Sequence, residues 1–193
     1  ALFIAVRGYE SDGHRFIKDA AENGAAAVIC EEKPDCDIPY ILVENSRLTE
    51  ALAAAAFYGH PERKLKMIGV TGTNGKTTTT NLVKTIIERA DGAKCGLIGT
   101  NRNMIGGEEL PAERTTPDSI ELMALLARMA ETGCTYCVME VSSHALFLDR
   151  VGAIRFTVGA FTNLTEDHLD FHKTMEAYAE AKSRHGFVEV QMI

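Results

Sequence analysis

The sequence predicts an α/β protein in which a small N-terminal α/β domain precedes a larger domain built on a mostly parallel sheet. Short apolar segments alternate along the chain with segments whose apolar residues recur at helical spacing. A glycine-rich turn joins one of these strands directly to a helix. The chain has 193 residues, 46% of them hydrophobic and 24% charged, which is ordinary for a chain that buries real cores.

The first domain is expected over residues 1–62, in the order βαββα. Its elements are strands at 1–6, 26–30 and 40–43, a helix from Phe16 closed by Gly24, and a helix capped by Ser46 and reaching Phe57. Pro61 stops the second helix, so we place the domain boundary after residue 62. The chain begins directly in an apolar strand, and we expect the front of this domain to be missing.

The second domain is expected over residues 63–193. Its elements are a strand at 65–68, a helix ending near Arg89, strands at 94–98, 134–141 and 156–161, and helices opening at Thr116-Pro117, at 142–148 and near Thr174. The segment 101–114 reads as a polar excursion, and 187–193 as a further strand or an artificial junction. We expect the C-terminal part of this domain to be missing. In such sheets ligands bind at the carboxyl ends of the strands.

The glycine turn, Gly72-Thr73-Asn74-Gly75-Lys76-Thr77, has the composition of a phosphate-binding loop. Glycines let successive backbone amides point at one spot, and the helix N-terminus adds partial positive charge. Lys76 would reach the terminal phosphates of a nucleotide, and Thr77 would hold Mg²⁺. The spacing is shorter than in the common pattern, whose first glycine would fall on Val70. A glycine-rich connection capped by threonine is the less favoured alternative.

The charge and hydropathy of the chain exclude several classes of function. The net charge is −7 and the Lys and Arg residues are scattered, which argues against nucleic-acid binding. No apolar run approaches the ~18 residues of a membrane span, and the N-terminus lacks a signal peptide. A cytoplasmic protein without a membrane partner is expected.

Cys134 and Cys137 have the spacing of a metal or redox pair, but they open an apolar run that is predicted to be a strand. Residues three apart on a strand point to opposite faces, so the two thiols could not hold one ion. Two buried, small apolar side chains are the better interpretation.

Two further segments at predicted strand ends carry polar side chains. Glu140 closes the apolar run 134–141, where it either faces a cation or accepts backbone amides from the next helix start. The segment 163–172 follows the next strand and packs four candidate ligands between Asp167 and His172. A solvated acidic turn would explain that run alone, but its position beside the other strand ends favours a metal role.

Five motifs now stand in one order: Thr71-Gly-Thr-Asn-Gly-Lys-Thr-Thr, Arg114-Thr-Thr-Pro117, Glu140-Val-Ser-Ser-His-Ala-Leu146 with Arg150, Asn163-x-x-x-Asp-His-Leu-Asp170, and Glu180-Ala-Lys182. Together they resemble the Mur ligases of peptidoglycan synthesis, most closely the branch that forms the UDP-N-acetylmuramoyl-tripeptide. The resemblance covers nearly the whole chain, with the shortened loop spacing as part of it. It implies a uridine-binding first domain and an ATP-binding P-loop domain.

The resemblance also assigns roles to individual positions. Catalytic roles fall on Lys76, Lys182 and His168. ATP contacts fall on Gly72, Thr73, Asn74, Gly75, Lys76, Thr77 and Thr78. Mg²⁺ ligands fall on Thr77, Glu140, His168 and Lys182, the last after carbamylation by CO₂. From its residues alone, Lys182 reads as an exposed helix lysine.

Substrate contacts are implied at Tyr9, Glu10 and Ser11, near the uridine, and at Thr115, Thr116, Ser142 and Arg150, near the muramoyl-dipeptide. The implied reaction joins diaminopimelate or lysine to UDP-N-acetylmuramoyl-L-alanyl-D-glutamate. The substrate carboxylate attacks the γ-phosphate of ATP, and the amine displaces the resulting acyl phosphate. Members of the family carry a third domain that binds the incoming amino acid.

The expected protein is therefore a monomeric, cytoplasmic bacterial ligase that uses ATP and Mg²⁺. Two alternatives remain. One is a ligase like folylpolyglutamate synthetase, which shares the phosphate loop but lacks the segment Arg114-Thr-Thr-Pro117. The other is a nucleotide-binding module without turnover, which is the expectation for the 193-residue piece in isolation.

Overall fold

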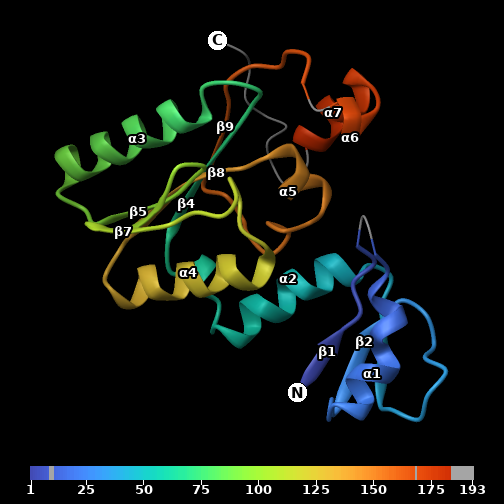
Figure 1. Cartoon of the computed structure of the whole chain (residues 1–193). Coiled ribbons are helices and arrows are strands. Elements are labelled where there is room, and N and C mark those ends of the chain that lie inside the picture. Colours follow the sequence, from blue (N-terminus) through green and yellow to red (C-terminus); the bar gives the residue numbers. More distant parts are fainter. Residues whose placement is uncertain (9–10, 168, 184–193) are drawn as a thin grey trace.

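The computed structural model describes residues 1–8, 11–167 and 169–183. It has two sheets, each with helices packed beside it (Figure 1). The α/β class and its predominantly parallel strands are as predicted. Of the predicted features, Tyr9, Glu10, His168 and the strand at 187–193 lie outside the described residues.

The first sheet has three parallel strands in the order β1 (Leu2–Ile4), β2 (Ala27–Cys30) and β3 (Tyr40–Leu42). A short 3₁₀ helix η1 (Gly13–Phe16) leads into α1 (Ile17–Glu22). The apolar side chains Ala5, Ile17 and Val28 form the centre of a small core between them. Gly24, with φ of +87°, lets the chain turn back after α1 as predicted.

The second sheet has six strands in the order β7-β6-β5-β8-β4-β9. They are β4 (Lys66–Thr71), β5 (Cys95–Ile98), β6 (Asn103–Ile105), β7 (Glu108–Leu110), β8 (Tyr136–Glu140) and β9 (Val158–Phe161). The four strands β5, β8, β4 and β9 are parallel, so their carboxyl ends meet at one edge.

The segment 101–114 is not a structureless excursion, because β6 and β7 form an antiparallel hairpin on the edge of the second sheet. Gly106 has φ of +60° in the turn, a conformation that glycine adopts without strain. The two strands are three residues long, and Glu108 and Glu109 are exposed. Such short and polar strands leave little alternating pattern in the sequence.

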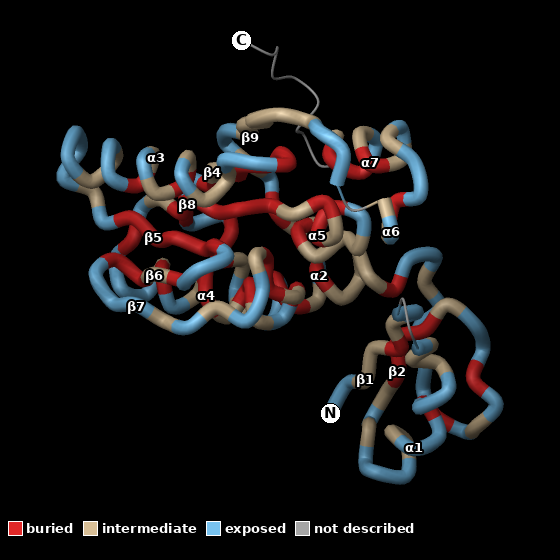
Figure 2. Tube along the Cα trace, turned by 45° about the horizontal axis from the view of Figure 1, so that its top comes forward, coloured by how far each residue is buried: buried red, intermediate tan, exposed pale blue. Residues whose placement is uncertain are grey.

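Helices cover both faces of the second sheet. They are α2 (Ser46–Phe57), α3 (Lys76–Asp91) and α4 (Ser119–Glu131), with a short 3₁₀ helix η2 (Pro61–Arg63) after α2. Figure 1 shows α3 on one side of the sheet and α4 with α2 on the other. Along β8, Val138 packs with the α3 side and Met139 with the α4 side, as strand periodicity requires. This alternation turns Glu140 toward α3, and Glu140 is buried. Figure 2 shows that the central strands of this sheet, such as β5 and β8, are largely buried.

The first sheet with η1 and α1 is called the first unit, and the second sheet with its helices is called the second unit. Helix α2 connects the first unit to the second. Its residues Ala54 and Ala55 belong to the same apolar cluster as Met67 of β4 and Leu126 of α4. At its other end the side chain of Asn45 donates a hydrogen bond to Asp149 at 2.9 Å. The division into residues 1–62 and 63–193 stays a prediction.

Two helix starts differ from the prediction. Asn45 caps α2, because its backbone is extended and its side-chain oxygen accepts the amide of Leu48 at 2.9 Å. Ser46 is therefore the first helical residue and not the cap. Asp118 caps α4 in the same way, by accepting the amide of Glu121 at 3.0 Å. The Thr116 hydroxyl instead forms hydrogen bonds with Glu140 and Ser142, in the site described below.

Three short helices complete the second unit: α5 (Ser143–Phe147), α6 (Leu169–His172) and α7 (Met175–Lys182). The sequence predicts α5 and α7, whereas α6 lies in the segment read as a loop. Thr174 caps α7 by accepting the amide of Ala177. Within the described residues, every helix falls short of a membrane-spanning segment in length or in apolar character.

Cys134 and Cys137 are buried free thiols. Burial raises the pKa of Cys137 well above its usual value. No cluster of three or more His, Cys, Asp or Glu side chains suited to a metal occurs among residues 1–8, 11–167 and 169–183. The interpretation of the pair as apolar packing agrees with this burial.

Candidate functional site

The loop between β4 and α3 adopts a glycine-dependent conformation. Gly72 has φ of +139° and Gly75 has φ of +85°. A Cβ atom on Gly72 would clash with the hydroxyl of Thr162, so the neighbouring strand end also requires glycine here. Gly75 precedes the first residue of α3 and carries no side-chain cap, which leaves the helix amides directed at the loop. Residues 72–75 therefore form a glycine-dependent turn that leads directly into the N-terminus of α3, and phosphate binding at residues 72–78 stays a prediction.

The segment after β9 holds the loop in place. The side chain of Asn163 accepts the amide of Asn74 and donates to the carbonyl of Asn74, both at 3.0 Å. The hydroxyl of Thr162 donates to the same carbonyl at 2.6 Å. Both the amide and the carbonyl of Asn74 are thus held by hydrogen bonds, so contacts within the protein fix the loop conformation.

Lys76 lies over the loop that precedes it. Its Nζ donates to the carbonyl oxygens of Gly72 and Thr73, both at 2.9 Å. Burial lowers the pKa of Lys76, while the negative charges of Glu140 and Asp167 raise it. The ammonium group is therefore in the loop and within the field of the carboxylate at the end of β8.

Lys182 reaches the same loop from α7. Its side chain is 1% exposed, and its Nζ donates to the carbonyl of Gly72 at 2.9 Å. The Nζ also lies 4.6 Å from the centre of the Tyr178 ring. Burial, followed by the charge of Lys76, lowers the pKa of Lys182 to about 7, although Asp167 acts in the opposite direction. The reading of Lys182 as an exposed helix lysine was wrong; it belongs to the phosphate-loop cluster.

Thr73 connects α7 to the loop as well. Its hydroxyl lies 3.2 Å from the hydroxyl of Tyr178 and 3.1 Å from the carbonyl of Thr165. It also accepts the amide of Thr165 at 3.0 Å. The sequence does not predict this bridge, because nothing local to residue 73 indicates a partner about a hundred residues away.

Glu140 is 1% exposed and its carboxylate is fully engaged. Oε2 accepts the hydroxyls of Thr77 and Thr100, and Oε1 accepts the amide of Thr100, each at 3.0 Å. The donors come from the phosphate loop and the end of β5, and not from the helix that follows Glu140. The alternative in which amides of the next helix satisfy Glu140 was therefore wrong, because two of the donors are hydroxyls and the one amide belongs to Thr100. Thr100 is a site residue that the sequence did not reveal.

Thr77 and Glu140 supply a hydroxyl oxygen and a carboxylate oxygen at one point. Hard oxygen ligands of this kind fit Mg²⁺, which is usually held by one or two protein oxygens together with phosphates and water. Burial of a carboxylate beside a phosphate loop also fits a cation site. The residues present are thus suited to the ion, whereas His168 lies outside the described residues.

A second group of predicted residues meets next to Glu140. The hydroxyl of Thr116 donates to the carbonyl of Glu140 at 2.9 Å and accepts the amide of Ser142 at 3.0 Å. Arg150 donates to the carbonyl of Thr116 at 3.2 Å. These side chains and Thr115 line a cavity of about 290 Å³. Thr116 is held here by Glu140, Ser142 and Arg150, which explains why it does not cap α4.

Thr100 connects the two groups. Its hydroxyl lies 3.1 Å from the hydroxyl of Thr115 while its amide and hydroxyl both bond Glu140. A continuous set of hydrogen bonds therefore runs from the phosphate loop at Thr77 to the cavity at Thr115. The structure brings the predicted nucleotide and substrate residues into one site.

The first unit reaches this site through the turn after β1. A cavity of about 550 Å³ is lined by Val6 and Gly8 from the first unit and by His144 and Arg150 from the second. Ser11 is exposed in the same turn, where the bridge between Arg7 and Asp12 closes the chain. The structure does not bring Ser11 to the wall of this cavity, and its neighbours Tyr9 and Glu10 are not described.

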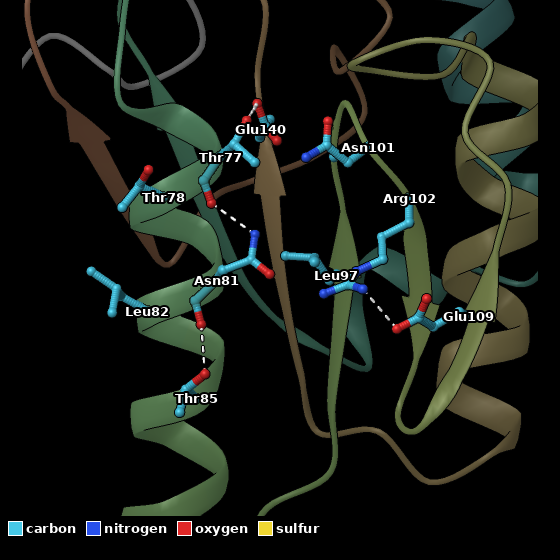
Figure 3. A pocket seen from close by; sticks show the side chains of 11 residues that line it. Thr77, Thr78, Asn81, Leu82, Thr85, Leu97, Asn101, Arg102, Glu109 and Glu140 are labelled. Carbon is cyan, nitrogen blue, oxygen red and sulfur yellow. Dashed lines mark hydrogen bonds and ion pairs between the residues drawn. The ribbon is translucent and has the colours of Figure 1, made fainter.

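A cavity of about 650 Å³ lies between α3 and the hairpin β6–β7. Figure 3 shows Thr77 and Glu140 at one end and Thr85 and Glu109 toward the other. Arg102 and Glu109 form an ion pair at 2.8 Å across its wall. Thr78, a predicted nucleotide residue, also faces this space. The sequence does not predict the cavity, because the hairpin that walls it was itself missed.

Comparisons with known proteins are specific. The family model described as Mur ligase middle domain matches residues 70–185, and the model described as Mur ligase family, catalytic domain, matches residues 1–89. A UDP-N-acetylmuramoyl-L-alanyl-D-glutamate–2,6-diaminopimelate ligase from Chlorobium phaeobacteroides is 56% identical over 186 residues. The ligase of the same name from Clostridium tetani is 53% identical over 186 residues.

Both matches cover 94% of this chain, but 36% and 38% of the relatives. The chain therefore spans little more than a third of the length of these relatives. A solved structure of a ligase with the same name is 32% identical, with a TM-score of 0.76 over 95% of this chain and 37% of that one. A MurF ligase from Thermotoga maritima in complex with ADP is 26% identical, with a TM-score of 0.53 over 94% of this chain and 39% of that one.

The structure of FolC from E. coli with DHPP and ADP is 22% identical, with a TM-score of 0.55. That match covers 71% of this chain and 38% of that chain. A likeness at this level shows a shared fold alone.

Proposed function

Because this chain belongs to the Mur ligase family, we propose that the protein containing it joins diaminopimelate to UDP-N-acetylmuramoyl-L-alanyl-D-glutamate at the expense of ATP. The relatives that are about half identical carry that reaction in their names. Within the structure, the observation that supports it most is the connection from Thr77 through Glu140 and Thr100 to Thr115. A phosphoryl donor and a carboxylate acceptor must meet in one place, and this set of residues connects the proposed ATP site to the proposed acceptor site.

The phosphate loop is proposed to bind ATP through residues 72–78. The amides at the start of α3 and the ammonium of Lys76 face the negative charge of the β- and γ-phosphates. During transfer the charge spreads over the phosphoryl oxygens, so fixed cations are what the reaction needs. No covalent protein intermediate is required, which agrees with a site dominated by lysines and hydroxyls.

Thr77 and Glu140 are proposed to hold Mg²⁺, with His168 as the further ligand implied by the family. The bound ion would neutralise charge on the phosphates and help to orient them. Thr100 keeps the Glu140 carboxylate pointed at Thr77 through two hydrogen bonds. Thr100 is thus a positioning residue for the ion.

The acceptor substrate is proposed to bind at Thr115, Thr116, Ser142 and Arg150. Arg150 is half-buried and suited to a carboxylate, since its guanidinium offers parallel donors. The carboxylate oxygen attacks the γ-phosphorus, ADP leaves, and the amine of the incoming amino acid then displaces phosphate from the acyl phosphate. Residues near Tyr9, Glu10 and Ser11 are proposed to hold the uridine end.

Lys182 is proposed to be carbamylated. The lysine ammonium first loses one proton. The lone pair of the neutral amine then attacks CO₂, an N–C bond forms as one C=O π bond opens, and a second proton leaves the nitrogen, so that the overall change replaces a cation with a carboxylate-like anion. A pKa of about 7 provides the neutral amine near physiological pH. The product anion would lie beside Lys76, because both lysines bond the carbonyl of Gly72. This removes the repulsion between two buried cations and supplies an oxygen ligand near the phosphates.

The decisive experiment measures ATP hydrolysis by the full-length protein that contains this chain. ADP should appear only when UDP-N-acetylmuramoyl-L-alanyl-D-glutamate and diaminopimelate are both present. Hydrolysis stimulated instead by folates and glutamate would assign the chain to the other ligase class. ATP binding without turnover under all conditions would favour a binding module. We propose in addition that the protein is a cytoplasmic monomer without nucleic-acid or membrane partners, consistent with its charge of −7.

A further inference from the structure

The 550 Å³ cavity between the two α/β units has an unusual concentration of arginine. Arg47 enters it from α2, Arg114 from the segment before α4, and Arg150 from the segment after α5. Two carboxylates, Glu50 and Asp118, also line it. The balance between these groups decides whether the cavity attracts an anion.

The two carboxylates offset the three arginines only in part, although the charges of Asp118 and Glu50 both raise the pKa of Arg150. Asp118 caps α4 and lies 3.6 Å from Arg114, so its charge is committed to those partners. Burial, followed by the charge of Asp118, raises the pKa of Glu50, which favours its neutral form. Arg114 is thus the arginine of this cavity that forms an ion pair, whereas Arg150 interacts with Asp118 and Glu50 at longer range.

The hydrogen bond that holds the Arg47 side chain in the cavity goes to a backbone carbonyl and not to a carboxylate. The Nη2 of Arg47 donates to the carbonyl of Arg7 at 2.5 Å. Within the part of the chain that the structure describes, no carboxylate lies within 4.0 Å of Arg47 or Arg150. Burial lowers the pKa of Arg150, and the charges of Arg114 and Arg47 contribute to the shift. The guanidinium groups are therefore close enough to repel one another.

The position of Arg47 along the cavity is also informative. Gly8, next to the turn proposed to hold uridine, lines one part of the wall, and Arg150, proposed to hold the peptide, lines another. Arg47 also lines a separate cavity with Arg7, where the carboxylates of Glu31, Glu44 and Asp149 are further lining groups. If a ligand binds with its uridine at the first position and its peptide at the second, the part that connects them must pass the Arg47 guanidinium. In the proposed substrate this connecting part consists of the diphosphate and the muramoyl sugar, and of these two only the diphosphate is anionic.

We propose that Arg47 is a contact for the diphosphate of the nucleotide-linked substrate, so that α2 takes a direct part in binding. The inference rests on the proposed function. The planar guanidinium suits phosphate oxygens, and its N–H groups beyond the one bound to Arg7 are available for them. Substrate binding would then join the first unit, α2 and the second unit, since each contributes a cationic or backbone contact.

The test compares the binding of UDP and of uridine to the full-length protein by calorimetry. Arg47→Ala should weaken UDP binding about tenfold, as expected for loss of a charged hydrogen bond, and leave uridine binding unchanged. Arg47→Lys should recover part of the loss, because it keeps the charge without the planar donors. Arg89→Ala, which removes an exposed arginine at the end of α3, is the matched control and should bind both ligands as the parent does.

Equal UDP affinity in Arg47→Ala and the parent protein would overturn the inference while leaving the proposed function intact. A parallel loss of UDP and uridine binding would also overturn it, because it would indicate a damaged fold and not a lost phosphate contact. If the parent protein binds neither UDP nor the UDP-linked substrate, the proposed function and this inference both fail.

Discussion

Lys76 and Lys182 donate to the same acceptor, the carbonyl oxygen of Gly72, each at 2.9 Å. One lysine belongs to the first turn of α3 and the other to the last turn of α7. Two ammonium groups this close repel each other, and burial adds to the cost of charging them. The pKa of Lys182 is accordingly lowered to about 7. This relationship gives the first prediction.

The stability of the protein should depend on pH through Lys182. An unfolded lysine keeps its proton up to about pH 10.4, whereas folded Lys182 loses it near pH 7. Between these values the unfolded state binds more protons, so the free energy of unfolding rises with pH, by at most about 1.4 kcal/mol per unit. Below about pH 7 the full cost of burying the charge is present.

The variant Lys182→Met keeps the length of the side chain and removes the charge. In CO₂-free buffer, urea unfolding should show Lys182→Met more stable than the parent below about pH 7. The difference should shrink as pH rises through this window and vanish near pH 10. Parallel pH curves for the two proteins would contradict the lowered pKa.

Chemical rescue tests the carbamate itself. Lys182→Ala removes the nitrogen on which the carbamate would form and leaves space beside Tyr178. Turnover by the full-length variant should fall strongly and be partly restored by short carboxylic acids, which can replace the missing carboxylate. Acid added to the parent protein serves as the control and should not raise its rate. Full activity of Lys182→Ala without additives would remove the proposed role.

The loop and its two flanking elements could be predicted because their signals are local. Glycine and lysine at a strand-to-helix junction indicate a phosphate loop, and the apolar spacing of Val83 and Ile87 indicates the helix. The helix caps were misplaced by one or two residues, since Ser46 and Asn45 are both good caps. Only the backbone conformation decides between such neighbours.

The long-range part of the site could not be derived from residue patterns. The burial of Lys182 depends on how α7 packs over the loop, so the resemblance to a family indicated it where composition did not. Thr100 is a single threonine after a strand, and its value arises only because β5 and β8 are neighbours. Arg47 likewise gains its significance from a cavity that several segments far apart in the sequence form.

The role of Lys76 can be measured with nucleotides of different length. Lys76→Ala should weaken Mg²⁺-ATP binding by about tenfold or more, because a charged hydrogen bond contributes about 1.5–3 kcal/mol. AMP binding should change little, since AMP lacks the phosphates that the lysine reaches. Lys66→Ala, which alters an exposed lysine at the start of β4, is the control for the loss of one positive charge. Equal ATP affinity in Lys76→Ala and the parent protein would argue against the phosphate assignment.

Gly99→Ala tests the ion site without removing any proposed ligand. A Cβ atom at residue 99 would lie 2.6 Å from Oε1 of Glu140, closer than real contacts allow. The buried carboxylate must then shift and weaken its 3.0 Å bond to the amide of Thr100. The Mg²⁺ concentration needed for half-maximal ATP turnover should therefore rise several-fold.

Gly107→Ala is the matched control, because a Cβ there meets nothing within 4 Å. Circular dichroism should show both variants folded. An unchanged Mg²⁺ requirement in folded Gly99→Ala would mean that the position of the Glu140 carboxylate does not govern ion binding, and the ligand would have to be sought elsewhere on the strand ends.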